Sequence, residues 1–189
     1  IIDPAFEGGR LRTVFPSMWD SGVAAVERLK PLADGTPVEI EIQTSHVAMD
    51  VIFRTLFSVP IEHEIASAAY DAFRHHQAAQ PVANITAVLP YPKWLPRLHC
   101  RKTRDTARTI RGLIGQLTQQ RAKEIADGTA PDDLSTKIMT TPDPETGELF
   151  EIDEMIDQVA IFFLAGHETS AAALAWSLYL LARYPDWQD

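Results

Sequence analysis

A chain of 189 residues, of which 46% are hydrophobic and 23% charged, is long enough and apolar enough to form a globular domain with a substantial core. Its 26 acidic and 17 basic residues give a net charge of −9, which argues against a nucleic-acid partner, because such a partner requires a basic face. The single cysteine excludes an internal disulfide framework and fits a reducing compartment.

The N-terminal half is predicted to be mostly helical. Apolar residues recur near a 3.6-residue period over Thr13–Ala33, before a stop at Asp34-Gly35, and helices are also expected over Ser45–Phe57 and Glu62–Gln80. Between the first two helices, Pro37–Ile42 alternates strictly between apolar and polar side chains. This alternation predicts a short β-strand, and the proline places that strand at a sheet edge.

Two further helices are predicted in the C-terminal half. Arg101–Asp127 carries apolar residues on one face and stops at Gly128. A longer apolar helix then follows a first turn that contains Glu151, Asp153 and Glu154, whose charges suit the positive end of a helix, and Pro185 is expected to end it.

The apolar span of this last helix, Val159–Ala182, is interrupted near its centre by polar residues. It is long enough to cross a bilayer core of roughly 30 Å. His167 and Glu168 argue against that interpretation, because an acid at the bilayer centre costs on the order of 2.5–3.5 kcal/mol. A helix buried in a soluble protein fits better. Buried ionisable groups occur mainly where chemistry requires them, so this interruption is the strongest candidate site.

The interruption, Ala165–Ser170, reads Ala-Gly-His-Glu-Thr-Ser and closely resembles the oxygen-activation motif of cytochromes P450, (Ala/Gly)-Gly-x-(Asp/Glu)-Thr-(Thr/Ser). Two weaker stretches agree in order and spacing. Pro4-Ala5-Phe6, followed by Gly9-Arg10-Leu11, resembles the end of the helix that lies against the haem in that family, and Asp50–Phe57 resembles its Asp-x-Ile-x-x-x-x-Phe helix.

The resemblance implies a mainly α fold, namely part of the orthogonal helical P450 fold with its long central helix, to which the short β-strand would be a minor addition. Residues 1–189 would form a single incomplete domain, the central portion of a P450-type catalytic domain. We expect such a fragment to be inactive alone. The family's Phe-x-x-Gly-x-x-x-Cys-x-Gly motif, which supplies the iron's thiolate, does not occur, and Cys100 has neither glycine nor phenylalanine at the required offsets. We therefore assign no metal ligand in this chain.

Residues of the long helix acquire expected roles from the resemblance. Phe162, Gly166, Thr169 and Ala173 share one helix face, with Ala165 beside it. The family resemblance implies that Ala165, Gly166, Thr169 and Ala173 lie against haem, and we expect Phe162 and Ile161 to contact substrate. It also implies that Thr169 donates a hydrogen bond during oxygen activation and that Glu168 relays protons from solvent.

Less specific interpretations of the same residues remain open. Small residues on a helix face also permit close helix packing, and a mid-helix threonine commonly bonds to the carbonyl four residues back, here that of Ala165. A zinc-protease motif is excluded because His-Glu-x-x-His would need histidine at Ala171. The apolar connection Val88–Leu95 matches the family's mobile roof over the substrate channel, or is a lid packed permanently on the core.

For the complete protein the resemblance implies a haem-thiolate monooxygenase that uses dioxygen to hydroxylate an apolar organic substrate. Electrons would come from a ferredoxin or a reductase. We expect a soluble, cytoplasmic enzyme, although an upstream membrane anchor is compatible with this sequence. Because half of the expected covering of the central helix is missing, the fragment is expected to self-associate. The alternative function is a non-catalytic, all-helical ligand-binding or interaction module.

Overall fold

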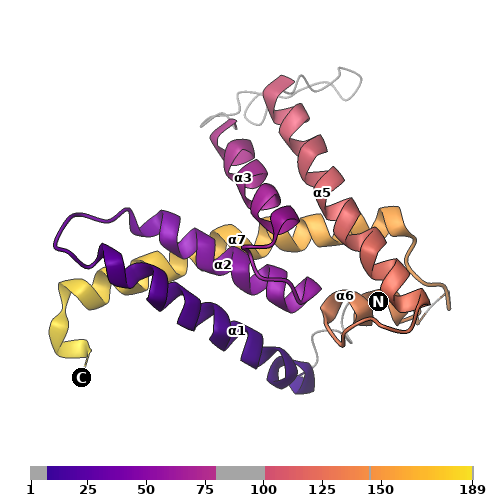
Figure 1. Cartoon of the computed structure of the whole chain (residues 1–189), viewed down its shortest axis with the longest axis horizontal. Helices are drawn as coiled ribbons and strands as arrows, with labels where there is room; N and C mark the ends of the chain where they lie inside the picture. Colours follow the sequence, from indigo (N-terminus) through magenta and orange to yellow (C-terminus); the bar gives the residue numbers. More distant parts are fainter. Residues whose placement is uncertain (1–7, 80–100, 145, 189) are drawn as a thin grey trace, which may run out of the picture.

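The computed structural model describes residues 8–79, 101–144 and 146–188, with side chains from residue 12 onward. All regular secondary structure in these ranges is helical, as the mainly α prediction requires, and no strand occurs in them. Figure 1 shows the arrangement of the α-helices and of two short 3-10 helices: α1 (Gly8–Leu29), η2 (Lys30–Leu32), α2 (Ile40–Phe57), α3 (Glu64–Ala79), α5 (Arg101–Ala126), α6 (Leu134–Thr140), α7 (Ile152–Arg183) and η3 (Pro185–Trp187).

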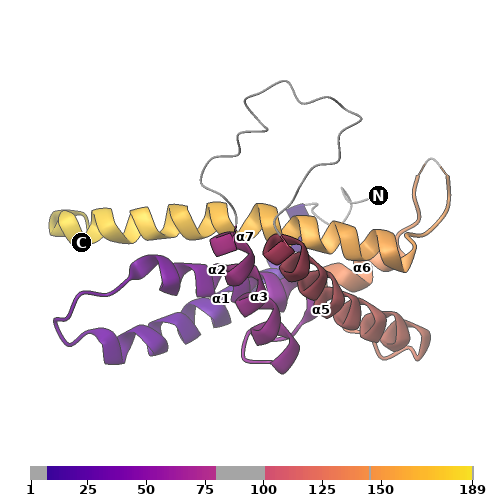
Figure 2. The same ribbon diagram turned by 90° about the horizontal axis from the view of Figure 1, so that it is seen from above.

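The organising element is α7, a straight rod that runs the whole width of the molecule. Figure 2 shows α1, α2, α3 and α5 on one side of this rod, and no other described helix covers its opposite side. Glu154 stabilises its first turn, because the carboxylate accepts a hydrogen bond from the Glu151 backbone N–H at 3.0 Å. The helix ends immediately before Tyr184-Pro185, as predicted. By length and composition alone α7 could cross a membrane, a test that the core helix of a soluble protein also passes.

The hydrophobic core lies where α7 crosses α2 and α3. Phe163 is fully buried there, with its ring centroid 4.7 Å from that of Phe53 on α2 and 5.5 Å from that of Phe73 on α3. Aromatic rings at these separations add favourable quadrupolar contacts to the burial of apolar surface. The core therefore fixes the first half of α7 on its neighbours, whereas the helix beyond Ala171 has no buried residue.

A buried carboxylate organises the C-terminal half of α2. Asp50 is fully buried, and both of its oxygens accept from Arg54 Nε at 2.9 Å. One of them also accepts from the Ile61 backbone N–H at 2.9 Å, which ties the connection after α2 to the helix. Because a buried charge is tolerated only when it is paired and hydrogen-bonded, these bonds explain why an acid stands in this apolar segment.

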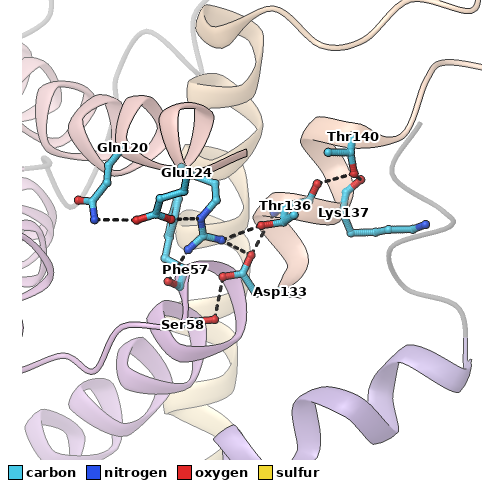
Figure 3. Close-up of polar contacts among 9 residues, drawn as sticks. Phe57, Ser58, Gln120, Glu124, Asp133, Thr136, Lys137 and Thr140 are labelled. Carbon is cyan, nitrogen blue, oxygen red and sulfur yellow. Dashed lines mark hydrogen bonds and ion pairs between the residues drawn. The ribbon is translucent and has the colours of Figure 1, made fainter. Parts of the chain in front are cut away.

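A second polar cluster joins the C-terminal end of α2 to α5 and α6 (Figure 3). Arg121 on α5 is buried and donates to the Asp133 carboxylate, to Glu124 at 2.8 Å and to the Phe57 carbonyl at 2.8 Å. Asp133 also accepts from Ser58 Oγ at 2.8 Å and caps α6 by accepting from the Thr136 N–H at 3.0 Å. Neither this cluster nor α6 was predicted from the sequence.

The predicted β-strand at Pro37–Ile42 is wrong. Residues 37–39 are irregular and α2 already begins at Ile40. Six alternating residues are too few to distinguish a strand from the start of an amphipathic helix. Tertiary packing decides here, because Thr44 and Ala48, one turn apart, are buried on the same face of α2, and Glu41 suits the positive end of the helix.

The other predicted helices occur with shifted ends. The first begins five residues before Thr13, at Gly8, and ends at Leu29, the second begins at Ile40, and the third begins at Glu64. Three sequence features lie outside the described residues: Pro4-Ala5-Phe6, the apolar connection Val88–Leu95, and Cys100.

Candidate functional site on the central helix

The polar motif Ala165–Ser170 lies at the middle of α7, where the helix passes from the core to a more exposed stretch. The inner face of α7 is formed by six buried residues, which from Ile156 onward lie three or four positions apart: Met155, Ile156, Val159, Phe163, His167 and Ala171. The opposite side of α7 is exposed. It carries three small residues, Ala165, Ala172 and Ala173, together with Thr169. The motif therefore places one histidine in the protein interior and its threonine on the side of α7 that no other described helix covers, which we call the uncovered or open side.

Thr169 makes the hydrogen bond that is usual for a hydroxyl within a helix. Its Oγ donates to the Ala165 carbonyl at 2.8 Å. Thr55, Thr118 and Ser177 bond back to their own helices in the same way, at 2.7 to 2.9 Å. The bond therefore does not mark Thr169 as functional. What distinguishes Thr169 is its exposure on the open side of α7, among residues too small to shield it.

His167 is buried and bonded across the helix interface. Its Nε2 lies 2.6 Å from Ser45 Oγ on α2. Burial lowers the pKa of His167 below its ordinary value of 6.5, while the neighbouring Glu168 carboxylate acts in the opposite direction. The imidazole is therefore neutral at neutral pH, so that one ring nitrogen carries a proton and the other can accept a hydrogen bond.

Glu168 lines a groove of about 640 Å³ between the N-terminal end of α2, the end of α3 and α7. The wall next to it carries His167 and Ser45, and Glu41 contributes a second carboxylate. The aromatic rings of Trp176 and Tyr179 form the far end of the groove, and their centroids are 5.7 Å apart. The groove is open to solvent, so a carboxylate at this place can exchange protons with bulk water.

Gly166 faces Ile52 of α2. A Cβ atom at this position would lie 3.4 Å from Ile52 Cδ1, about the distance of an ordinary van der Waals contact. Phe162 is half-buried against the core, whereas Ile161 is 54% exposed. Among the predicted cofactor-binding residues, Ala165, Thr169 and Ala173 share the uncovered side, and Gly166 lies at its edge towards α2.

The structure does not bring the two predicted catalytic residues together. Glu168 lies in the groove with His167, while Thr169 follows about 100° further around the helix, on the open side. Ser45 is a site residue that sequence reasoning missed, because no local pattern connects positions 122 residues apart. The only available signal was a histidine inside an apolar span, which implies an unidentified polar partner.

Comparisons with known proteins agree on one family. The family model described as "Cytochrome P450" matches residues 2–189. Similar curated proteins are the 11-oxo-beta-amyrin 30-oxidase of Glycyrrhiza uralensis, 27% identical over all of this chain, and the cyclooctat-9-en-7-ol 5-monooxygenase of Streptomyces melanosporofaciens, 28% identical over 98% of it. The crystal structure of the cytochrome P450DA haem domain matches 97% of the chain with a TM-score of 0.70 and 23% identity, which supports the fold.

The matched region is a limited part of each relative. The chain spans 38% of the plant protein, 39% of the bacterial protein and 36% of the crystallised haem domain. The relatives therefore contain more than half of their length outside the region that corresponds to this chain.

Proposed function

Because this chain belongs to the cytochrome P450 family, we propose that it is the central part of the catalytic domain of a haem-thiolate monooxygenase, which uses dioxygen to hydroxylate an apolar organic substrate. The observation that carries this proposal is the place of Thr169, exposed on the uncovered side of α7 within an Ala-Gly-x-Glu-Thr-Ser motif. As one incomplete domain, residues 1–189 would act only together with the remainder of the fold.

The uncovered side of α7 fits a flat prosthetic group. Ala165, Thr169 and Ala173 are exposed there, and their small side chains would allow the plane of a haem to approach the helix backbone. When bound, haem would supply the iron at which dioxygen is reduced. We assign no iron ligand in this chain. Gly166 would lie at the edge of this side, where it faces Ile52 of α2.

Thr169 is the proposed catalytic hydroxyl. A rotation about its χ1 torsion releases the bond to the Ala165 carbonyl, and this carbonyl retains the backbone hydrogen bond of the helix. The hydroxyl then becomes a donor towards the open side. Because the helix backbone holds this side chain in place, the hydroxyl would present a proton close to the reacting oxygen, where an unordered water would instead favour the loss of peroxide.

Glu168 is the proposed proton relay. Its carboxylate lines the solvent-open groove, one residue before Thr169 in the chain. A carboxylate in this position can take a proton from bulk water and pass it inwards through an intervening water, which oxygen reduction in a dry pocket requires. The supporting geometry is the groove itself, since it gives the carboxylate continuous access to solvent.

The remaining roles concern the substrate and the partners. Phe162 and Ile161 are proposed to contact an apolar substrate, and a ferredoxin or reductase is proposed to deliver electrons. We also propose a soluble, cytoplasmic enzyme, with which an upstream membrane anchor stays compatible; in support, buried His167 and the Glu168 carboxylate argue against α7 as a membrane span.

The proposal is tested with the complete gene product after reconstitution with haem. The expected result is a thiolate-type spectrum of the reduced carbon monoxide complex, together with oxygenated product when an electron donor and an apolar substrate are supplied. Cys100→Ser is the control, and it should leave the spectrum unchanged. Failure of the complete protein to bind haem would instead favour the non-catalytic helical module.

A further inference from the structure

The interface between α2 and α7 contains a directional polar contact among apolar ones. Around it, Phe53 packs on Phe163 with ring centroids 4.7 Å apart, and Ile52 packs against Gly166. Such contacts favour burial but tolerate small rotations, because apolar packing is non-directional. The 2.6 Å contact between Ser45 Oγ and His167 Nε2 requires a defined orientation of the two helices.

The position of this contact along α7 makes it important. His167 and Ala171 are the last buried residues of the helix, and from Ala172 to Arg183 every residue is exposed or half-buried. The two proposed catalytic residues directly follow His167. A rotation of α7 at this point would therefore change the direction of Glu168 and Thr169 more than that of the core residues.

The contact depends on the protonation of the imidazole. Burial lowers the pKa of His167, so the neutral ring predominates and can accept from the Ser45 hydroxyl. Among the described residues, the charged groups that line the groove with His167 are Glu168 on α7, whose charge raises the pKa of the imidazole, and Glu41 on α2, while α3 contributes the neutral Gln77. Because the folded pKa is below 6.5, the contribution of His167 to stability is complete above that pH and is lost as the pH falls through the folded pKa.

We propose that His167 is a positioning residue for the catalytic pair: its neutral imidazole, bonded to Ser45, sets the rotation of α7 that directs Glu168 into the groove and Thr169 to the open side. This inference rests on the proposed monooxygenase function. It predicts that the Ser45–His167 contact controls how reduced oxygen is divided between product and peroxide, and that this division depends on pH.

The test uses the complete, haem-loaded protein with Ser45→Ala and His167→Phe, which both remove the hydrogen bond. His167→Gln is the rescue variant, because its amide reaches about as far as Nε2 and does not titrate. Ser177→Ala is the matched control, since it removes an exposed serine hydroxyl further along α7. The amount of peroxide released per equivalent of reduced electron donor consumed is measured between about pH 5 and 8, the range in which histidine titrates.

We expect Ser45→Ala and His167→Phe to raise the peroxide fraction by about two- to tenfold at neutral pH, as the loss of one neutral hydrogen bond allows. His167→Gln should resemble the wild type at neutral pH but lose the rise in peroxide towards acid pH. Its denaturation midpoint should likewise fall less in acid than that of the wild type, because the contribution of His167 is removed while those of other titrating groups remain. If the wild type releases little peroxide and Ser45→Ala and His167→Phe release the same fraction of reduced oxygen as peroxide at every pH, this inference is wrong. If the wild type does not turn over at all, the proposed function fails as well.

Discussion

Arg121→Met provides a direct test of the polar cluster that joins α2, α5 and α6. Arg121 is 4% exposed and Asp133 only 3%, so the substitution leaves a buried carboxylate without its cation. Removal of one partner of a buried ion pair typically costs about 3–5 kcal/mol. Asp133 still accepts from Ser58 Oγ at 2.8 Å and from the Thr136 N–H at 3.0 Å, which places the expected loss near the lower limit, at about 3 kcal/mol.

The assay is urea denaturation of the complete protein, followed by circular dichroism. Arg108→Met is the control, because that side chain is 70% exposed on the same helix and should change stability by less than about 0.5 kcal/mol. Because the ion pair contributes to stability only while the carboxylate is charged, the difference in unfolding free energy between Arg121→Met and the wild type should be measured at neutral pH. Equal stability of the two variants at neutral pH would refute this account of the cluster.

Three further predictions concern packing, assembly and haem ligation. Phe163→Ala should destabilise the protein by about 3–5 kcal/mol in the same assay, because it opens a cavity at the crossing of α2, α3 and α7, whereas Leu164→Ala at a 51% exposed position should cost far less. The 189-residue chain alone should form dimers or larger oligomers in light scattering, since Trp176 and neighbouring apolar residues of α7 are exposed; a monodisperse monomer over a wide concentration range would contradict this. The same chain, mixed with haem, should give no thiolate-type carbon monoxide spectrum; such a spectrum, abolished by Cys100→Ser, would show that this expectation is wrong.

Periodicity was sufficient to predict the five long helices of the described residues, because their buried faces depend on residues three and four positions apart, whereas the seven-residue α6 was missed. The long helix was predicted most securely, since Phe163 and its neighbours form a continuous buried face and Pro185 limits its end. The strand at Pro37–Ile42 failed for the opposite reason. Its alternation is local, whereas the packing of α2 is determined by helices far away in the sequence.

The candidate site was predicted only as far as its local motif extends. The sequence identified Glu168 and Thr169, because an acid and a hydroxyl interrupt an apolar helix. It did not identify Ser45, which approaches His167 only after α2 packs on α7. The pair of Arg121 with Asp133 was missed for a related reason, although Asp133 before Leu134-Ser135-Thr136 is a recognisable helix cap. Contacts that cross between elements depend on tertiary packing, and no local pattern of a single sequence encodes them.

The catalytic role of Thr169 is tested most directly in the complete enzyme. The measurement is the amount of product formed and of peroxide released per equivalent of reduced electron donor consumed. Thr169→Ala keeps high helix propensity and leaves the Ala165 carbonyl with its backbone hydrogen bond, so stability and substrate binding should change little. We predict that electrons are still consumed but that oxygen increasingly leaves as peroxide, whereas Glu168→Gln mainly slows turnover by limiting proton supply. If Thr169→Ala retained full coupling, its hydroxyl would serve only the helix-internal bond that the structure already contains, and the proposed catalytic role would be wrong.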